Sequence, residues 1–196
     1  MWLPIIIIIS YLLGSIPFGV VVARLFKIDI TKYGSGNIGA TNVLRTLGLV
    51  PGLVVLLLDL FKGTLAVYIA ALILKDPLQI ILCALAAILG HMFSIFIGFK
   101  GGKGAAVGLG VLLGIAPDIF LITVVLVVLI IIATRYVSLA SIICPLFTVV
   151  LMICFNRPIP YTVAAIAVSL LMIYKHLPNI KRLLNGIERK IGENNG

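Results

Sequence analysis

The residues best suited to chemistry lie in a small, polar, glycine-rich segment, Gly34–Arg45, between two long apolar runs. Its three glycines allow tight backbone turns that present N–H groups to a ligand. Arg45 adds a planar cation able to bind a phosphate through two parallel hydrogen bonds. This first segment therefore predicts an anion site. Its candidate binding residues are Gly34, Ser35, Gly36, Asn37, Thr41, Asn42 and Arg45.

A second glycine-rich, basic segment, Gly98–Gly104, precedes another apolar run. Turns of this kind, followed by the start of a helix, bind phosphate well. The spacing is one residue short of a nucleotide P-loop and no Ser or Thr follows Lys103, so nucleotide hydrolysis is not predicted. Lys100 also fits a lysine that snorkels from a helix end, which leaves Lys103 as the stronger ligand. The candidates here are Lys100, Gly101, Gly102, Lys103 and Gly104.

A third polar segment, His176–Glu188, follows the last apolar run and is basic. His176 stands close to Asn179 at the expected membrane surface, which makes it the better candidate for a general base. Neither histidine of the chain has the serine and carboxylate context of a hydrolytic triad. The acyl-CoA acyltransferase pattern, a histidine followed by an aspartate five positions later, fails after His91 because position 96 is Phe96.

Ionisable residues also occur inside the apolar runs. Asp59 and Lys62 are three positions apart, so they share a helix face and can neutralise one another. Charges at membrane depth suggest function, and a structural pair and a substrate contact both remain open. His91 is expected to be a packed, hydrogen-bonded histidine. Asp59 also completes the spacing of a dinucleotide-binding fingerprint that begins at Gly34, but its apolar surroundings exclude the soluble fold that this motif needs.

Composition defines the elements that must position these residues. Of the 196 residues, 62% are hydrophobic and only 11% are charged, which is typical of a polytopic helical membrane protein. We expect one integral membrane domain over residues 1–196. The first run, Leu3–Phe26, lacks the features of a cleavable signal peptide and is expected to be a retained helix. The three cysteines all fall in apolar runs and suggest neither a disulfide framework nor a metal site.

The charges predict the topology. The formal net charge of +9 lies mostly in short loops and the tail, as in cytoplasmic loops of membrane proteins. Placing all the basic segments on one side requires the long run 105–133 to split at Pro117, which predicts about seven crossings with the N-terminus outside and the C-terminus cytoplasmic. The three polar segments then share the cytoplasmic face. A short amphipathic helix, Ala40–Leu47, would carry Arg45 back toward the first segment.

Three motifs in this order resemble those of the bacterial acyl-phosphate:glycerol-3-phosphate acyltransferase (PlsY) family. They are S-G-N-I-G-A-T-N-V-L-R at 35–45, G-H-M-F at 90–93 followed by G-F-K-G-G-K-G at 98–104, and H-x-x-N-I-K-R-L-L-N-G-x-E at 176–188. L-D-L-F-K-G at 58–63 and Y-V-S-L-A-S at 136–141 are also similar. The resemblance covers nearly the whole chain. One departure is Leu177-Pro178, where the family usually has charged residues, and the proline could begin a new turn after His176.

The resemblance implies transfer of a fatty acyl group from acyl phosphate to the sn-1 hydroxyl of glycerol 3-phosphate, without cofactor or metal. It assigns active-site roles to Ser35, Arg45, His176 and Asn179, phosphate binding to the second segment, and a structural role to Glu188. It also implies a bacterial inner-membrane location with the site facing the cytoplasm, and contact with the soluble enzyme that makes acyl phosphate. No nucleic-acid partner is expected.

Several alternatives stay open at this point. The proton of the glycerol hydroxyl could pass to His176 or to a phosphate oxygen of the donor. A transporter of organic phosphate or anionic lipid, with Arg45, Lys103 and the Asp59–Lys62 pair along its pathway, is the alternative function. A related acyltransferase that uses acyl carrier protein or acyl-CoA is the other.

Overall fold

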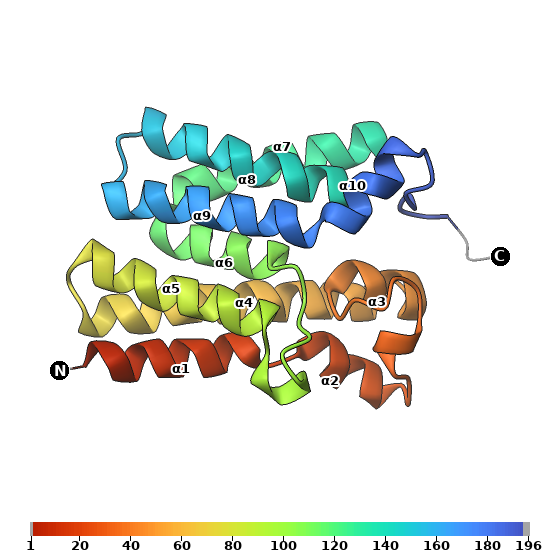
Figure 1. Ribbon diagram of the computed structural model, residues 1–196, viewed down its shortest axis with the longest axis horizontal. Coiled ribbons are helices and arrows are strands. Elements are labelled where there is room, and N and C mark those ends of the chain that lie inside the picture. Colours follow the sequence, from red (N-terminus) through yellow and green to blue (C-terminus); the bar gives the residue numbers. More distant parts are fainter. Residues whose placement is uncertain (1, 194–196) are drawn as a thin grey trace. The chain divides into compact units, whose positions relative to one another are not determined.

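The chain is helical, without strands, over residues 2–193, which are the residues that this computed structural model describes (Figure 1). This confirms the predicted all-α class. The chain divides into two compact units, one ending at Ile115 and the other beginning at Ala116. That residues 1–196 form one domain stays a prediction.

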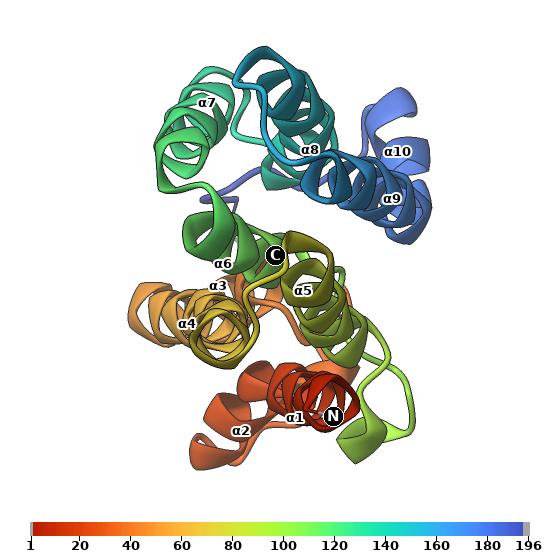
Figure 2. The same cartoon turned by 90° about the vertical axis from the view of Figure 1, so that its left-hand side faces the viewer.

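The first unit packs its helices side by side, and Figure 2 views α1, α4 and α5 almost end-on. Helix α5 lies against α1, α6 lies against α4, and α3 folds back on α4. The helices are α1 (Leu3–Ser15), α2 (Phe18–Leu25), α3 (Ala40–Leu47), α4 (Leu49–Ile73), α5 (Pro77–Met92) and α6 (Ala105–Ile115), with 3-10 helices η1 (Ile30–Lys32) and η2 (Ile95–Ile97). The short amphipathic helix predicted from the sequence is thus confirmed as α3.

Glycines let α4 and α6 approach backbone to backbone. A Cβ on Gly63 of α4 would overlap the carbonyl oxygen of Val107, and one on Gly110 of α6 would overlap that of Leu60. Thr64 adds a hydrogen bond across the same contact, from its Oγ1 to the Gly110 carbonyl at 2.8 Å. Small residues at helix contacts are the usual way for membrane helices to pack closely. Helix α4 therefore holds α6, and with it the segment that leads into α6.

A proline separates α1 from α2. Ile16 precedes Pro17 and takes an extended ψ of 116°, because the proline ring disfavours the helical conformation of the preceding residue. The helix ends at Ser15, and the Ile16 carbonyl accepts a hydrogen bond from Lys62 of α4 at 2.7 Å. The break thus provides a backbone acceptor for the buried Lys62.

The second unit is a succession of helices in which α8 packs against both α7 and α9. Its helices are α7 (Pro117–Thr134), α8 (Val137–Cys154), α9 (Ile159–Lys175) and α10 (Leu177–Leu184). Helix α7 begins directly after Ala116, so the predicted split of the long apolar run at Pro117 is confirmed. Helix α10 bends away from α9 by 59°.

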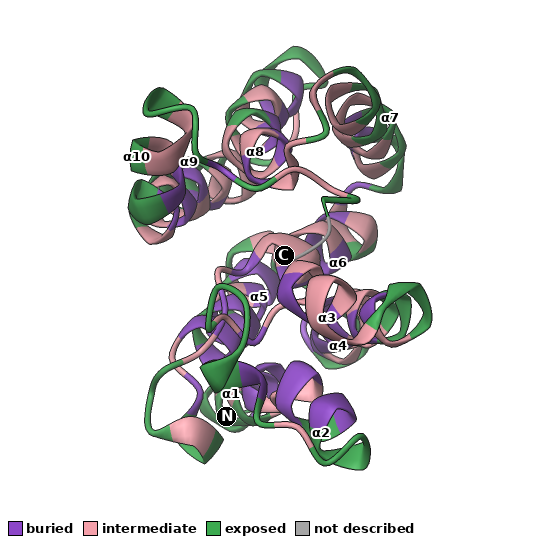
Figure 3. Cartoon of the chain, turned by 90° about the vertical axis from the view of Figure 1, so that its right-hand side faces the viewer, coloured by how far each residue is buried: buried purple, intermediate pink, exposed green. Residues whose placement is uncertain are grey.

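Five helical spans in the described part of the chain are long and apolar enough to cross a membrane, or up to six if α9 and α10 count as one bent span. Most of α7 is coloured exposed or intermediate in Figure 3, as expected for a helix that faces lipid. Each predicted crossing corresponds to a helix, but the count of seven is not confirmed. Helix α6 has 11 residues, a length of about 16 Å against a hydrocarbon core of about 30 Å.

Candidate active site

Asn42 of α3 shapes the loop that carries the first glycine-rich segment. Its Oδ1 accepts the Ser35 N–H at 2.8 Å, and its Nδ2 donates to the carbonyls of Tyr33 at 3.0 Å and Ile30 at 3.3 Å. The residue is buried, with 2% of its surface exposed. Asn42 therefore braces the loop, and its role as a phosphate ligand stays a prediction.

The backbone of the same loop needs glycine. Gly34 and Gly36 have φ of 62° and 69°, a region that residues with a Cβ rarely adopt. Asn37 Oδ1 accepts the Gly39 N–H at 2.9 Å, so Asn37, like Asn42, stabilises the turn. Ser35 remains exposed between the two glycines, as a substrate-binding hydroxyl requires.

Helix α3 carries the remaining candidates of the first segment. It begins at Ala40, directly after the loop, so the positive end of its dipole lies where an anion would bind. Thr41 and Arg45 are four residues apart, which places them on the same face of the helix. Both are half-buried. This arrangement can hold a phosphate by a cation, a hydroxyl and backbone amides.

The second segment folds back onto the end of α5. The Gly101 N–H donates to the Met92 carbonyl at 3.2 Å, and the Gly102 N–H donates to the His91 carbonyl at 3.0 Å. These two amides therefore serve the turn, whereas the sequence interpretation offered them to a phosphate. Helix α6 starts at Ala105, immediately after Gly104, so the start of a helix does follow Lys103 as expected. Lys103 is half-buried and Lys100 is exposed.

The first and second segments belong to the same end of the first unit. Ile97, just before the second segment, packs against a buried cluster that includes Ile38 and Val43 of the first segment. A Cβ on Gly19 of α2 would overlap the carbonyl oxygen of Ile38, so α2 also lies directly under the loop. Two of the three predicted polar segments are therefore neighbours in one compact unit.

A buried polar cluster lies between the apolar helices of this unit. Lys62 Nζ is 2.7 Å from Asp59 Oδ1, 2.7 Å from the Ile16 carbonyl oxygen and 3.1 Å from His91 Nδ1. Asp59, Lys62 and His91 are each at most 4% exposed. Lys62 thus has an ion pair with Asp59 and two hydrogen bonds, to the Ile16 carbonyl and to His91, all within the protein. The geometry favours the structural alternative for this cluster over a direct contact with substrate.

The third segment lies in the second unit, at the junction of α9 and α10. His176 is the residue between the two helices, because Pro178 begins the new helix α10 at its first turn. The new turn that Pro178 could begin is therefore present: His176 precedes α10, and Asn179 lies in the first turn of that helix. His176 Nδ1 lies 2.8 Å from the Met172 carbonyl, which only accepts, so Nδ1 carries the proton and Nε2 is the basic nitrogen.

Asn179 is positioned by a carboxylate. Its Nδ2 donates to Glu188 Oε1 at 2.7 Å, and Arg182 Nε donates to Glu188 Oε2 at 2.7 Å. Burial acts to raise the pKa of Glu188, but the hydrogen bonds from Asn179 and Arg182 and the arginine charge together hold this pKa below its usual value. These contacts fit a structural role for Glu188, which stays a prediction. The sequence interpretation missed Arg182, for which its place in the motif was the only available signal.

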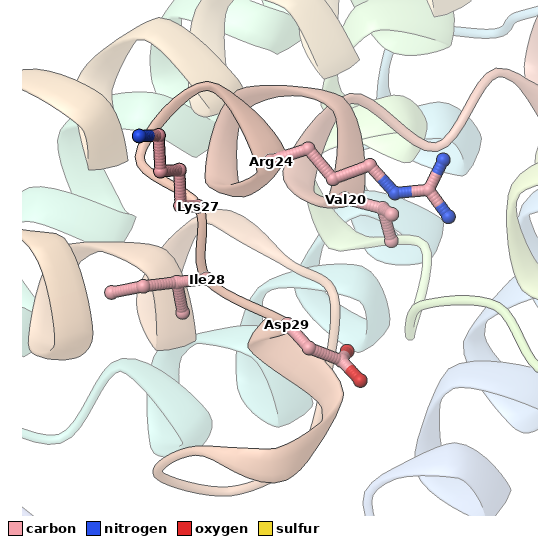
Figure 4. Close-up of a pocket in the computed structure, with 5 residues that line it drawn as sticks. All are labelled: Val20, Arg24, Lys27, Ile28 and Asp29. Atoms are coloured by element: carbon pink, nitrogen blue, oxygen red, sulfur yellow. The ribbon is translucent and has the colours of Figure 1, made fainter.

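A hollow of about 320 Å³ lies at the end of α2. It is lined by Val20, Arg24, Lys27, Ile28 and Asp29. Figure 4 shows the Arg24 guanidinium and the Lys27 ammonium pointing to opposite sides. Because the two cations do not converge, this cavity is not a built phosphate site. Within residues 2–193, no three His, Cys, Asp or Glu side chains gather closely enough to hold a metal ion.

The apolar helices and the cationic, glycine-rich loops define the class: an integral membrane protein with a site for an anionic group. The sequence profile of the glycerol-3-phosphate acyltransferase family matches residues 4–186. A Moorella thermoacetica protein named glycerol-3-phosphate acyltransferase 2 is 47% identical, over 98% of this chain and 99% of its own length. A Thermus thermophilus glycerol-3-phosphate acyltransferase is 44% identical, over 95% and 94% of the two chains.

Solved structures agree. The crystal structure of PlsY (YgiH), an integral membrane glycerol 3-phosphate acyltransferase, in its glycerol 3-phosphate form has a TM-score of 0.95 and 40% identity, over 98% of this chain and 96% of that one. The lysophosphatidic acid form of the same protein has a TM-score of 0.92 over the same shares. The chain therefore belongs to the glycerol-3-phosphate acyltransferase family and is an integral membrane acyltransferase.

Proposed function

We propose that this enzyme transfers a fatty acyl group from an acyl phosphate to the sn-1 hydroxyl of glycerol 3-phosphate. The products are lysophosphatidate and inorganic phosphate, an early step of phospholipid synthesis. The main support is the likeness at 40% identity to PlsY, a protein solved in glycerol 3-phosphate and lysophosphatidic acid forms. The cations and glycine turns of the first unit suit two phosphorylated reactants.

In this proposal the chain mainly orients its substrates. An acyl phosphate is already activated, so positioning and stabilisation of negative charge provide most of the rate acceleration. Arg45 and Lys103 bind phosphate together with the first turns of α3 and α6. Ser35 binds substrate from the exposed loop, and Asn179 does so from the start of α10. Asn37, Asn42 and Glu188 hold these groups in place.

The proton of the attacking hydroxyl passes to a phosphate oxygen of the donor. Two observations support this assignment over His176. The Nδ1 of His176 donates to the Met172 carbonyl, so a backbone oxygen and not a carboxylate orients this nitrogen, unlike in a catalytic triad. Glu188, the carboxylate of the third segment, accepts hydrogen bonds from Asn179 and Arg182. The Nε2 of His176 instead positions the substrate.

His176→Gln tests this assignment. Without a general-base role we expect turnover to fall by less than about tenfold, because a lost neutral hydrogen bond is worth about 1 kcal/mol. A fall of about 10²–10⁴-fold, the usual value of a general base, would instead assign the proton transfer to His176. The melting temperature of the purified variant controls for loss of the Nδ1 hydrogen bond to Met172.

We further propose that the enzyme resides in the bacterial inner membrane with its three polar segments facing the cytoplasm. The basic loops support this orientation, since Lys and Arg accumulate on the cytoplasmic side. The acyl donor is made by a soluble enzyme, which would meet this face.

The decisive experiment uses purified protein in detergent with labelled glycerol 3-phosphate and three donors in turn: acyl phosphate, acyl-CoA and acyl carrier protein. We expect labelled lysophosphatidate with acyl phosphate alone. Formation of lysophosphatidate with acyl-CoA or acyl carrier protein would show that the proposed donor specificity is wrong. Uptake of glycerol 3-phosphate into reconstituted vesicles without any product would indicate a transporter.

A further inference from the structure

The buried cluster around Lys62 has a geometry that fixes the protonation of His91. Lys62 Nζ forms an ion pair with Asp59 Oδ1 at 2.7 Å and donates a hydrogen bond to the Ile16 carbonyl at 2.7 Å. A further N–H of Lys62 points to His91 Nδ1 at 3.1 Å, while Asp59 Oδ1 is 3.7 Å from that nitrogen, beyond hydrogen-bond distance. Since an ammonium can only donate, Nδ1 must accept. His91 is therefore neutral with its proton on Nε2.

The Nε2 side of the same ring faces the second glycine-rich segment. A Cβ built on Gly102 would overlap His91 at Nε2 first and at the neighbouring ring carbons next. The backbone carbonyls of His91 and Met92 receive the amide hydrogens of Gly102 and Gly101. The His91 ring and the backbone carbonyls at the end of α5 therefore both contact the turn that contains Gly101 and Gly102.

We propose that Lys62 is a positioning residue. Asp59 and the Ile16 carbonyl hold the Lys62 ammonium in place. Lys62 in turn orients the His91 ring, which fixes the conformation of the turn Gly101–Gly104. Lys103 and the start of α6 bind phosphate from this turn. This inference rests on the proposed function of that turn. The α1–α2 break at Pro17 contributes to this positioning, because it leaves the Ile16 carbonyl available to accept a hydrogen bond from Lys62.

The test removes both charges together. Asp59→Asn with Lys62→Met leaves no unpaired charge in the membrane interior, and such neutral replacements of a buried pair are commonly tolerated. We expect the KM for glycerol 3-phosphate, or its calorimetric Kd where turnover is too low, to rise about tenfold, as for loss of one positioning hydrogen bond. The kcat and the melting temperature should change little.

Thr64→Val is the matched control. Thr64 lies on the same helix and ties α4 to α6 through the Gly110 carbonyl, but it has no hydrogen bond to the His91 cluster. This variant should lower the melting temperature without changing the KM. If the double variant behaves in the same way as Thr64→Val, the Lys62 cluster only stabilises the fold and the positioning role is wrong.

A spectroscopic measurement separates this inference from the proposed function. The chain has two histidines, so ¹⁵N-histidine NMR in a His176→Gln background reports on His91 alone. We expect a protonated Nε2 with Lys62 present and a mixture of tautomers in the double variant. An unchanged spectrum in the double variant would overturn the positioning role of Lys62 even if acyl transfer is confirmed. Failure of acyl transfer with the expected spectra would refute the reaction while the contact between Lys62 and His91 stands.

Discussion

At the scale of single residues, polar side chains in the glycine-rich segments divide into those that build loops and those that are proposed to bind substrate. The side-chain amides of Asn37 and Asn42 form hydrogen bonds with backbone groups in and next to the first segment. Ser35 stays exposed and Arg45 half-buried. In the second unit Glu188 similarly orients Asn179. Short polar residues in a motif thus have two kinds of role, which only their hydrogen-bond partners distinguish.

Arg45→Lys tests the phosphate role of the guanidinium. The lysine keeps the charge but loses the planar pair of donors, so we expect the KM for glycerol 3-phosphate or acyl phosphate to rise about tenfold or more. Steady-state kinetics with each substrate varied in turn shows which phosphate is affected. Arg24→Lys on the exposed face of α2 is the control and should leave both constants unchanged. Wild-type kinetics for Arg45→Lys would remove this residue from the site.

Glu188 predicts a pH-dependent contribution to stability. Its pKa is lowered in the folded protein from the ordinary value of 4.5, so its stabilisation is present above that value and is lost as the pH falls through the lowered pKa. We expect Glu188→Gln to cost about 1 kcal/mol at pH 7, because the partner Arg182 is 36% exposed and partly screened by solvent.

Thermal unfolding of wild type and variant across this pH range measures the effect. The difference in melting temperature should shrink as the pH is lowered below 4.5. Glu193→Gln, an exposed carboxylate in the same tail, is the control and should show little difference at any pH. A difference that is independent of pH would mean that Glu188 acts by packing rather than by charge.

At the scale of elements, the decisive features are helix ends. Helix α5 ends where its last carbonyls receive the amides of Gly101 and Gly102, and α6 starts three residues later. Pro178 lies in the first turn of α10, and the chain bends by 59° between α9 and α10, with His176 at the bend. The sequence signals for these ends were Gly and Pro. Their directions in space came from packing against neighbouring helices.

Gly102→Ala tests the fit between the second segment and α5. The added methyl group would overlap the His91 ring, so the turn must shift and the KM for glycerol 3-phosphate should rise about tenfold. Gly98→Ala is the matched control, since its Cβ meets no atom within 4 Å and only the strain of a φ of 62° is tested. It should lower the melting temperature without changing the KM. If Gly102→Ala, like Gly98→Ala, keeps the wild-type KM, the turn Gly101–Gly104 is not part of the substrate site.

At the scale of the whole molecule, the three polar segments are distributed over two compact units. The first and second segments share one end of the unit that ends at Ile115. His176, Asn179 and Glu188 belong to the unit that begins at Ala116. The proposed reaction needs both groups on the same side of the membrane, which is the prediction that the basic loops support.

Cysteine labelling checks this arrangement. Ser35→Cys and Asn179→Cys, each in a background with the exposed Cys154 replaced by Ala, are treated with a membrane-impermeant maleimide from one side at a time. We expect both to be labelled from the cytoplasmic side only. Labelling from opposite sides would rule out a common active site. Lys75→Cys, in the α4–α5 connection, is the control expected on the outer side.

The sequence by itself determined the helical membrane class, the family, the helix Ala40–Leu47 and the break at Pro117. These depend on local properties, namely apolar length, glycine and proline positions and motif spacing. Only the tertiary structure decided that Asn37 and Asn42 brace the loop, that Lys62 contacts Asp59, the Ile16 carbonyl and His91 inside the first unit, and that Gly102 abuts His91. Hydrogen-bond partners far apart in the chain are set by helix packing, which residue spacing does not encode.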